Sequence, residues 1–489
     1  MQNLIKLFSL IGTSSVSLSV VAAQQQLPNI VFFLIDDLGW KDLGCYGSDY
    51  YETPNIDKLA TEGMMFTSAY AMPTSSPSRA SLMTGKYPPK TGIYAVDGYA
   101  ETPLAMQKVI GIKSARFISS GETTIAEVLK QAGYTNGHFG KWHLGNTPET
   151  YPLNQGFDMN VAGCEAGSPK SYFAPYGNIK NIDPQINGTY LTDVLENEAL
   201  KFVEANQNKP FFLYFPFYEV HVPLQAKKEW FEKYNSKKQG YNGQNVPEYA
   251  AMISYTDHCI GKIIDKLNEL NLTNNTLIII SSDNGGQIVA TSNSPLKGQK
   301  GNLYEGGIRV PLIVKWPGKV KPGSEIDVPV SVVDFYPTFA SIAGMKTNED
   351  NNLDGKDLLP LLLQKGTFKR ETLFWHLPNY NGNGKSNSKL WQFPGGAIRK
   401  GEWKLIENFE DGSIELFNLV SDIGETKNVA QLYPKKKEEL FNDLKNWQKI
   451  NKAPIPFKVN ADFDQKARTW TSENNVRNEK ELERIKSVR

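Results

Sequence analysis

A chain of 489 residues is long enough for two or three domains, or for one large α/β domain with an appendage. Its hydrophobic content of 40% and charged content of 21% are ordinary for a globular protein. The formal net charge of +1 gives no support for nucleic acid or an acidic membrane surface as a general partner. Any specificity for anions must therefore come from a local cluster of cations.

Residues 1–23 have the pattern of a signal peptide. Lys6 supplies a positive start, a modestly apolar stretch follows, and the small residues Val21 and Ala23 suit the cleavage positions. An uncleaved anchor helix is the alternative, but its serines and threonines make this stretch too polar for a bilayer. No cysteine stands directly after the apolar stretch, which argues against a lipoprotein anchor. We therefore expect an exported protein with no membrane span, because the later apolar runs are far too short.

The three cysteines, Cys45, Cys164 and Cys259, are too few for a disulfide scaffold. One bridge and three buried thiols both remain open at this point. No cysteines or histidines have the spacing of a zinc ligand set, so a structural zinc site is not expected.

Strands and helices alternate along the first two thirds of the chain. Residues 28–37 form a nearly continuous apolar run, which predicts a strand buried on both faces. Within residues 53–66 the pattern predicts a helix with Thr53 as N-cap and Pro54 at the first position, stopped by Gly63. Residues 121–134 repeat this scheme with a threonine cap and a terminal glycine. The remaining predictions are a helix at 192–207, a strand at 210–217, a long helix at 247–270 and a buried strand at 276–286.

This alternation predicts an α/β fold with a large mixed, mainly parallel sheet sandwiched by helices. In sheets of this kind, ligands collect at the carboxyl ends of the strands. Acidic pairs follow two of the predicted strands, Asp36–Asp37 and Asp283–Asn284. These two strand ends are the first candidates for a functional site.

The pattern changes after about residue 365. Residues 395–422 predict short strands joined by glycine and aspartate turns, and residues 435–449 predict one amphipathic helix. We expect a catalytic domain at 24–365 and a smaller C-terminal subdomain at 366–489, built from an antiparallel sheet and a packed helix. The charged tail beyond about residue 465 is expected to be loosely held.

The strongest functional signal is the segment SSPSRASLMTG, which begins at Ser75. A helix start at this point offers free N–H groups and a dipole that favour an anion. Alone, the segment is most simply a serine N-cap followed by a proline. However, it resembles the sulfatase signature, in which Cys or Ser, any residue and Pro-Ser-Arg are followed by Thr-Gly. In that family the first residue, here Ser75, is oxidised to formylglycine.

The resemblance covers most of the chain after the signal peptide and implies an alkaline-phosphatase-like fold. Asp36 and Asp37 match the family's first pair of metal ligands, Asp283 and Asn284 match the second, and modified residue 75 completes the set. Oxygen ligands without His or Cys select Ca²⁺ or Mg²⁺, and the resemblance implies one Ca²⁺ per chain. Each pair alone would be a strand-end cap more often than a ligand, but two such pairs favour a shared site.

Four further residues match active-site positions of the sulfatase family. They are Lys141, His143, His221 and Lys300. The resemblance implies that Arg79, from the signature, and Lys141 hold oxygens of the formylglycine and of the sulfate. Lys297 lies close to Lys300, so a register shift within this segment stays open. His138 and His258 are expected to be structural, as lone histidines usually are.

The resemblance also implies a mechanism. One hydroxyl of the hydrated aldehyde at residue 75 attacks sulfur, and the alcohol leaves with a proton from His221 or Lys300. His143 then removes the proton of the second hydroxyl, and the collapse expels sulfate and restores the aldehyde. A plain serine would stall after the first step, because its sulfated form has no comparable exit.

A serine rather than a cysteine at position 75 is known in this family from bacteria, where a radical enzyme of the S-adenosylmethionine type performs the oxidation. With the signal peptide, this implies a bacterial periplasmic or secreted enzyme. Two C-terminal segments look like segments common in carbohydrate-acting members, so a sulfated carbohydrate is the expected substrate. His376 and Arg399 in these segments are candidate substrate contacts, and packing between the two domains is their alternative role.

Two other functions compete with this interpretation. A phosphonate or phosphate ester hydrolase of the same superfamily would share the acidic pairs, but it would usually add His and Asp ligands for a second metal. An inactive sulfatase-like glycan-binding protein would have lost some site residues, whereas every matched position is intact here.

Overall fold

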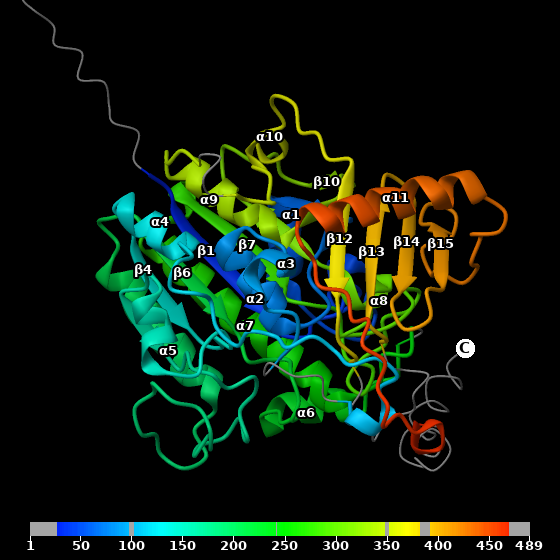
Figure 1. The fold of residues 1–489 in the computed structure, drawn as a ribbon. Helices are drawn as coiled ribbons and strands as arrows, with labels where there is room; N and C mark the ends of the chain where they lie inside the picture. Colours follow the sequence, from blue (N-terminus) through cyan, green and yellow to red (C-terminus); the bar gives the residue numbers. More distant parts are fainter. Residues whose placement is uncertain (1–26, 97–101, 241, 348–351, 382–391, 469–489) are drawn as a thin grey trace, which may run out of the picture.

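The computed structural model describes residues 27–96, 102–240, 242–347, 352–381 and 392–468. The predicted signal peptide and the end of the charged tail, residues 469–489, lie outside the described residues. Figure 1 shows a large sheet flanked by helices, with a smaller sheet and one long helix beside it. The expected α/β architecture with a smaller antiparallel sheet is confirmed.

The large sheet contains eight strands in the order β10-β2-β9-β7-β1-β6-β4-β5. Their bounds are β1 (Asn29–Ile35), β2 (Met64–Phe66), β4 (Thr135–Phe139), β5 (Met159–Val161), β6 (Phe211–Pro216), β7 (Thr276–Ser282), β9 (Leu312–Lys315) and β10 (Ser324–Ile326). β1 lies parallel between β6 and β7, whereas β9 runs antiparallel to its neighbours β7 and β2. The sheet is therefore mixed and mainly parallel, as predicted.

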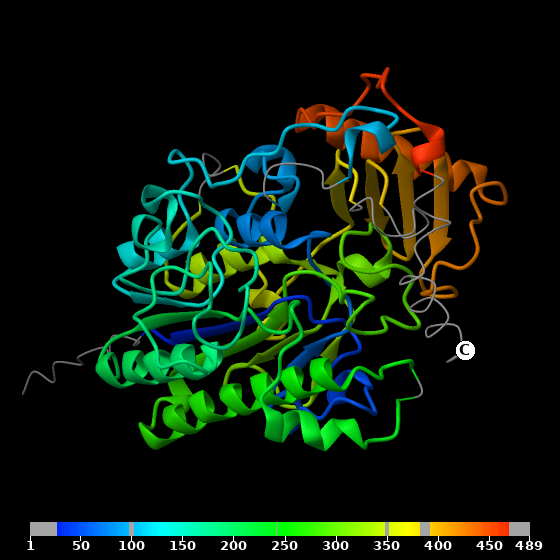
Figure 2. The ribbon, with the colours of Figure 1, turned by 90° about the horizontal axis from the view of Figure 1, so that it is seen from below.

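Every residue of β1 is buried, because helices cover both faces of the sheet. Ile30 and Phe32 point into the core that contains α4 and α9, whereas Val31 and Phe33 point into the core that contains α5 and α7. Figure 2 shows the sheet between these two groups of helices. A run without polar alternation is what such a doubly covered strand requires.

The helix starts predicted at Thr53 and within residues 121–134 are found in the structure. The bounds of the helices are α1 (Pro54–Glu62), α2 (Ser75–Thr84), α3 (Pro88–Thr91), α4 (Ile125–Gln131), α5 (Leu191–Ala205), α6 (Lys228–Asn235), α7 (Pro247–Glu269), α8 (Glu305–Ile308), α9 (Phe335–Ile342), α10 (Leu359–Leu362) and α11 (Pro434–Ile450). Thr53 is the N-cap of α1 and Gly63 its C-cap. Thr124 forms a capping box with Glu127 at the start of α4.

The second sheet is antiparallel, with strands in the order β12-β13-β14-β15. These strands are β12 (Thr372–Leu377), β13 (Gly395–Lys400), β14 (Trp403–Asn408) and β15 (Ile414–Asn418). Leu440 and Leu444 of α11 pack on Ile398 and Leu405 of the sheet. A small three-stranded sheet, β11-β3-β8, is formed by β3 (Ala69–Tyr70), β8 (Arg309–Val310) and β11 (Val330–Ser331).

Two further points from the sequence are answered by the structure. All three cysteines are free thiols, so the bridge that was left open does not form. Within the described residues, no helix combines the length and apolar character needed to cross a membrane.

Candidate active site

Four neighbouring strands of the large sheet, β7, β1, β6 and β4, end at one edge and carry the matched residues there. Asp36 directly follows β1, and Asp283 directly follows β7. Lys141 follows β4 after Gly140, whose positive φ of 128° and close approach to the Pro216 carbonyl leave no room for a side chain. The sheet order thus gathers residues that lie far apart in the chain.

Ser75 is the first residue of α2, and every residue of this helix is buried. Its Oγ lies 3.1 Å from Oδ1 of Asp36, 3.3 Å from Oδ1 of Asn284 and 3.3 Å from Nζ of Lys141. The hydroxyl therefore sits at a helix N-terminus, between metal-type oxygen ligands and a cation.

Three fully buried carboxylates, those of Asp36, Asp37 and Asp283, each offer an oxygen within 4.8 Å of the others. Buried charges of one sign require compensation, and three cations provide it. The contacts are Lys141 Nζ to Asp36 Oδ2 at 2.6 Å, Lys300 Nζ to Asp37 Oδ2 at 2.8 Å, and Arg79 Nε to Asp283 Oδ2 at 2.9 Å. The cluster combines strong acceptors with cations suited to an anionic group.

The cations favour the ionised forms of Asp36 and Asp37. Burial raises the pKa of Asp36, but Lys141 and other cations outweigh it and lower that pKa to about 2. Burial also raises the pKa of Asp37, but the Lys300 ammonium and other cations outweigh burial, so that this pKa is lowered. Conversely, burial lowers the pKa of His221, so its imidazole is favoured in the neutral form.

The donor set fits a hard divalent cation. Asn284 donates from Nδ2 to Oδ1 of Asp37 at 2.7 Å, which leaves its amide oxygen facing the Ser75 hydroxyl. Carboxylate and amide oxygens at this spacing, with no thiolate in the cluster, are ligands that Ca²⁺ and Mg²⁺ prefer. Asp36, Asp37, Asp283, Asn284 and residue 75 could all contribute to such a site.

The two matched histidines differ in the contacts that they make. His221 Nε2 is 3.6 Å from Asp37 Oδ2, and Nδ1 is 2.7 Å from the Val222 carbonyl, which favours a proton on Nδ1. His143 is buried and has a positive φ of 59°, a strained backbone conformation of the kind found at functional sites. Its ring packs against Gly167, where a Cβ would come within 2.7 Å of Cε1.

The structure also shows the surroundings of Lys297 and Lys300, between which the motif left a choice, and of His138 and His258. Lys300 contacts Asp37, whereas Lys297 lies over the Tyr304 ring at 3.8 Å, so Lys300 is the lysine of this cluster. His138 is fully buried among aromatic rings, and His258 contacts Trp230 and Tyr255. Both positions suit the structural roles expected for these histidines.

The two candidate substrate contacts lie in packed surroundings. His376 is only 2% exposed, and its Nε2 is 2.9 Å from the Pro454 carbonyl. Arg399 contacts the hydroxyl of Tyr70 and donates from Nε to the Gly401 carbonyl at 3.1 Å. These contacts favour a packing role for both residues, so substrate binding by either residue stays a prediction.

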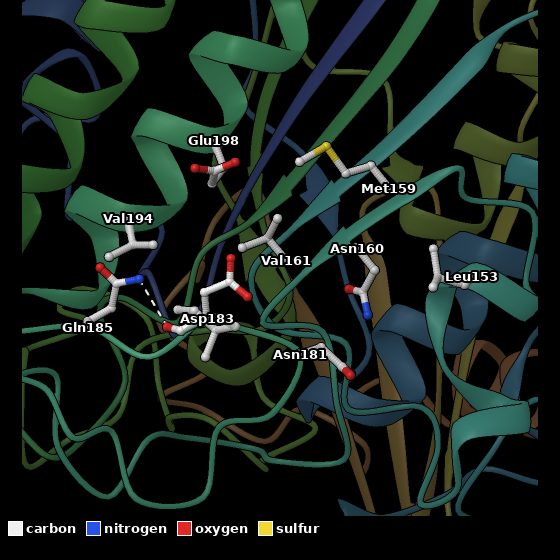
Figure 3. A pocket seen from close by; sticks show the side chains of 10 residues that line it. Leu153, Met159, Asn160, Val161, Asn181, Asp183, Gln185, Val194 and Glu198 are labelled. Carbon is white, nitrogen blue, oxygen red and sulfur yellow. Dashed lines mark hydrogen bonds between the residues drawn. The ribbon is translucent and has the colours of Figure 1, made fainter.

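Two cavities differ in their relation to the cluster. A pocket of about 80 Å³ is lined by Ser76 and His143 and therefore adjoins it. Figure 3 shows a larger hollow of about 480 Å³ beside edge strand β5, lined by Met159, Asp183 and Glu198 among others. None of the matched residues lines this larger hollow, whereas His143 lines the smaller pocket. Sequence patterns had not indicated its lining residue Glu165.

Comparisons with known proteins agree with this geometry. The sulfatase family model matches residues 28–345, and the model for the C-terminal part of N-sulphoglucosamine sulphohydrolase matches residues 299–452. A sulfatase of Formosa agariphila is 32% identical and is aligned over 88% of this chain and 90% of its own length. The N-acetylgalactosamine-6-sulfatase of Sus scrofa is 35% identical over 78% of this chain and 74% of its own.

A solved structure is similar over almost its whole length. The structure of Ps i-CgsB in complex with k-i-k-neocarrahexaose has a TM-score of 0.72 and 32% sequence identity. The similarity covers 93% of this chain and 99% of that chain. It therefore includes both the large sheet and the smaller antiparallel sheet.

Proposed function

Because this chain belongs to the sulfatase family and is a sulfuric ester hydrolase, we propose that it removes sulfate from a carbohydrate by means of one Ca²⁺ and a formylglycine made from Ser75. The observation that carries this proposal is the position of the Ser75 hydroxyl. It lies at the start of α2 and within 3.3 Å of Asp36, Asn284 and Lys141. A group at this point can meet both a metal ion and a bound anion.

The metal ion and the formylglycine would each supply one kind of chemistry. Ca²⁺ bound by Asp36, Asp37, Asp283, Asn284 and residue 75 would withdraw electron density from the sulfate oxygens and neutralise developing charge. Formylglycine would supply a hydrated aldehyde, whose two hydroxyls allow attack and later release of sulfate.

The chain's own cations hold and orient the anion. Lys141 Nζ is 3.3 Å from the Ser75 Oγ, so it can contact both residue 75 and a sulfate oxygen. Arg79 is fixed by Asp283 and by the Lys141 carbonyl, at 2.9 Å in each case. Because these groups are buried, their charges act on the transition state with little screening by water.

Two histidines are suited to proton transfer. His221 presents Nε2 towards Asp37, and a bound sulfate ester would favour its protonated form, so we assign it the proton for the leaving oxygen. Lys300 is the second candidate, and its ion pair with Asp37 keeps it charged in the free protein, since Asp37 raises its pKa against the effect of burial. His143 is assigned the removal of a proton from residue 75.

A carbohydrate substrate is supported by the relatives. The similar mammalian proteins are named for N-acetylgalactosamine 6-sulfate, and the similar solved structure holds an oligosaccharide. Export to the periplasm or the medium, through the signal peptide at 1–23, and oxidation of Ser75 by a radical S-adenosylmethionine-type enzyme are parts of the same proposal. So is the division into domains at 24–365 and 366–489.

The test combines mass spectrometry of the peptide that contains Ser75 with turnover assays. Protein made with a Ser-type maturing enzyme should have lost the mass of two hydrogen atoms at Ser75 and should cleave sulfated sugars. Ser75→Ala should be folded and inactive. Full turnover by wholly unmodified protein would contradict the mechanism, and preferential cleavage of a phosphonate ester would favour the alternative hydrolase.

A further inference from the structure

Asp42 is a completely buried acid in the loop that follows β1, and it belongs to none of the ion pairs of the candidate site. Each of its two carboxylate oxygens accepts two hydrogen bonds. Oδ2 accepts from the Gly39 N–H at 2.8 Å and the Tyr249 hydroxyl at 2.7 Å, and Oδ1 accepts from the Thr291 hydroxyl at 2.8 Å and the Gln244 amide at 3.0 Å. Four donors use the full capacity of a carboxylate and compensate for its burial.

The four donors come from three separate segments of the chain. Gly39 lies in the same loop as Asp42, and this loop begins with the first pair of candidate metal ligands. Thr291 lies in the loop after β7, which begins with the second pair. Gln244 precedes α7, and Tyr249 lies in the first turn of that helix. Asp42 therefore joins the two loops that carry the candidate ligands and connects both of them to α7.

The Tyr249 hydroxyl connects Asp42 with the candidate ligand Asp37. It lies 2.7 Å from Asp42 Oδ2 and 3.1 Å from the Asp37 carbonyl oxygen, so its single proton lies between two acceptors. Asp37 has a positive φ of 61°, in the left-handed region that residues other than glycine seldom adopt. Such a conformation persists only where its surroundings hold it. Here the Asp37 N–H donates to Asp283 Oδ1 at 3.3 Å, and the Tyr249 hydroxyl holds the carbonyl side.

The loop after β1 closes tightly on the Asp42 side chain. A Cβ at Gly39 would lie 2.7 Å from Asp42 Oδ2 and 2.9 Å from Asn293 Oδ1, which leaves no room for a side chain there. Asn293 in turn donates from Nδ2 to the Gly286 carbonyl at 2.8 Å, two positions after the candidate ligand Asn284. A change in the Asp42 side chain therefore acts on both of the loops that carry candidate ligands.

We propose that Asp42 is a positioning residue for the metal site, which it holds in the geometry that binds Ca²⁺ before the ion arrives. It does so through Tyr249, which contacts the Asp37 carbonyl, and through Thr291, which fixes the loop after β7. The inference rests on the proposed function, because it requires that Ca²⁺ binds at this cluster. Loss of the Asp42 carboxylate should weaken Ca²⁺ binding about 10- to 100-fold, the usual effect of removing a partner that orients metal ligands.

The experiment titrates Ca²⁺ into the chelated mature enzyme and follows binding by calorimetry at neutral pH. Asp42→Asn keeps the size of the side chain but turns an amide donor towards some of the four donors, so its Kd for Ca²⁺ should rise about 10- to 100-fold. Tyr249→Phe keeps the ring and removes only the hydroxyl that contacts Asp37, so its Kd should rise about 3- to 10-fold. Turnover of an aryl sulfate at saturating Ca²⁺ should stay within about threefold of wild type, because Asp42 acts through the ligands.

The matched control is Asp257→Asn. Asp257 is another buried aspartate of α7, and it accepts hydrogen bonds only from Asn55 and Ile56 at the start of α1, which carries no residue of the cluster. This variant should lose stability in chemical denaturation but keep the wild-type Kd for Ca²⁺.

An unchanged Kd in Tyr249→Phe and in folded Asp42→Asn would overturn the inference, and so would an equal rise of Kd in Asp257→Asn. Either result leaves the proposed calcium site intact. If Asp42→Asn does not fold, the Kd of Tyr249→Phe decides alone. If the chelated wild type binds no Ca²⁺, the inference and the proposed metal site are both overturned.

Discussion

At the scale of single residues, the candidate site depends on a one-to-one match between buried acids and cations. Asp36 is paired with Lys141, Asp37 with Lys300, and Asp283 with Arg79. Removing one member of such a pair leaves a buried charge without a partner, which costs more than the pair itself contributes. The strongest effects of substitution are therefore expected at these pairs.

Lys300→Met tests the assignment of the second active-site lysine. Lys300 contacts Asp37, so its loss should lower kcat for an aryl sulfate by about 100- to 1,000-fold, the effect of removing one electrostatic contact to the transition state. Lys297→Met is the matched control, because Lys297 packs on Tyr304 and should be dispensable for catalysis. The assignment would be reversed if Lys297→Met lost activity and Lys300→Met did not.

The roles of Lys300 and Lys297 also show where sequence patterns reach their limit. The two lysines are three positions apart, and the motif alone leaves a register shift open. The hydrogen bonds of the structure decide which lysine belongs to the site. The Lys300 backbone N–H donates to the Gly286 carbonyl at 3.1 Å, which helps to place this residue beside the site. Residues in exact motifs, such as Ser75 and Arg79, could be predicted, whereas Glu165 lines a pocket that no motif marks.

His376 offers a pH-dependent test of packing against substrate binding. Burial lowers its pKa to about 4, compared with about 6.5 when unfolded. The unfolded chain binds the additional proton between these values, so the stabilising contribution is complete above pH 6.5 and is lost as pH falls towards 4. His376→Gln keeps a donor for Pro454 and should flatten the dependence of the melting temperature on pH in this range.

If His376 serves packing, this variant keeps wild-type kcat/KM on sulfated sugars at pH 7.5. A selective loss of activity on sugars, with the pH dependence of melting unchanged, would instead support the substrate contact that the sequence had suggested. Melting curves from pH 4 to 8 and one set of kinetic assays distinguish the two roles.

At the scale of elements, the second sheet forms buried ion pairs with the segment that follows Lys300. Lys404 of β14 is completely buried and lies 2.9 Å from Glu305 Oε1 and 2.8 Å from Glu425 Oε1. Glu425 also accepts a hydrogen bond from the Glu305 N–H at 2.6 Å, at the start of α8. The loop that follows β7 is thus anchored by residues of the smaller sheet, and the site depends on both parts of the chain.

Lys404→Met should both destabilise the protein and weaken catalysis. Breaking a buried ion pair by removing one partner costs about 3–5 kcal/mol. Glu425 would lose its cation partner, whereas Glu305 would keep its ion pair with Arg309 at 2.8 Å. Lys400→Met is the control, since Lys400 forms partly exposed pairs with Glu439 and Asp443, which contribute less than about 1 kcal/mol. Chemical denaturation compares the free energies of unfolding of the two variants, and turnover of an aryl sulfate measures the effect on catalysis.

A second variant separates charge from packing at this interface. Lys404→Met combined with Glu425→Gln removes the carboxylate that lost its partner and should recover part of the lost stability. Equal stability of Lys404→Met and the wild type would contradict the anchoring role of Lys404.

Long elements could be predicted, and very short ones could not. β1 and β7 have seven residues each, all buried, so their apolar runs were unambiguous. β3, β8 and β11 have two residues each, too few to show any periodicity. The segment of β12 suggested substrate contacts rather than a strand, and its Trp375 donates from Nε1 to the Ala71 carbonyl at 2.9 Å, four residues before Ser75.

At the scale of the whole molecule, the sheet order decides which strand ends meet. Alternating strands and helices predicted a mainly parallel sheet, but they did not predict that β9 returns antiparallel between β7 and β2. Such a pairing depends on contacts between residues hundreds of positions apart, such as the hydrogen bond from the Tyr46 hydroxyl to the Leu312 carbonyl at 2.9 Å. Local patterns carry no information about contacts of this kind.

Calcium is expected to stabilise the whole fold without being required for it. The three carboxylates of the cluster are already matched by Lys141, Lys300 and Arg79, so the protein should stay folded when a chelator removes the ion. An ion that binds only the folded state stabilises it by about 2.7 kcal/mol at 100 times its Kd. Adding Ca²⁺ to chelated protein should therefore raise the melting temperature by several degrees and restore activity.

The variants Asp37→Asn and Asp265→Asn make this expectation specific to the site. Asp37 belongs to the oxygen cluster, so its substitution should remove most of the Ca²⁺-dependent shift in melting temperature, whereas Asp265 is exposed on α7 and its substitution should leave the shift unchanged. Because the shift arises from binding to the folded state, it should grow with the logarithm of the free Ca²⁺ concentration above Kd. Metal analysis should find one calcium per chain. A fold lost irreversibly on chelation, or a shift produced by zinc and not by calcium, would contradict a single hard-cation site at the ends of β1 and β7.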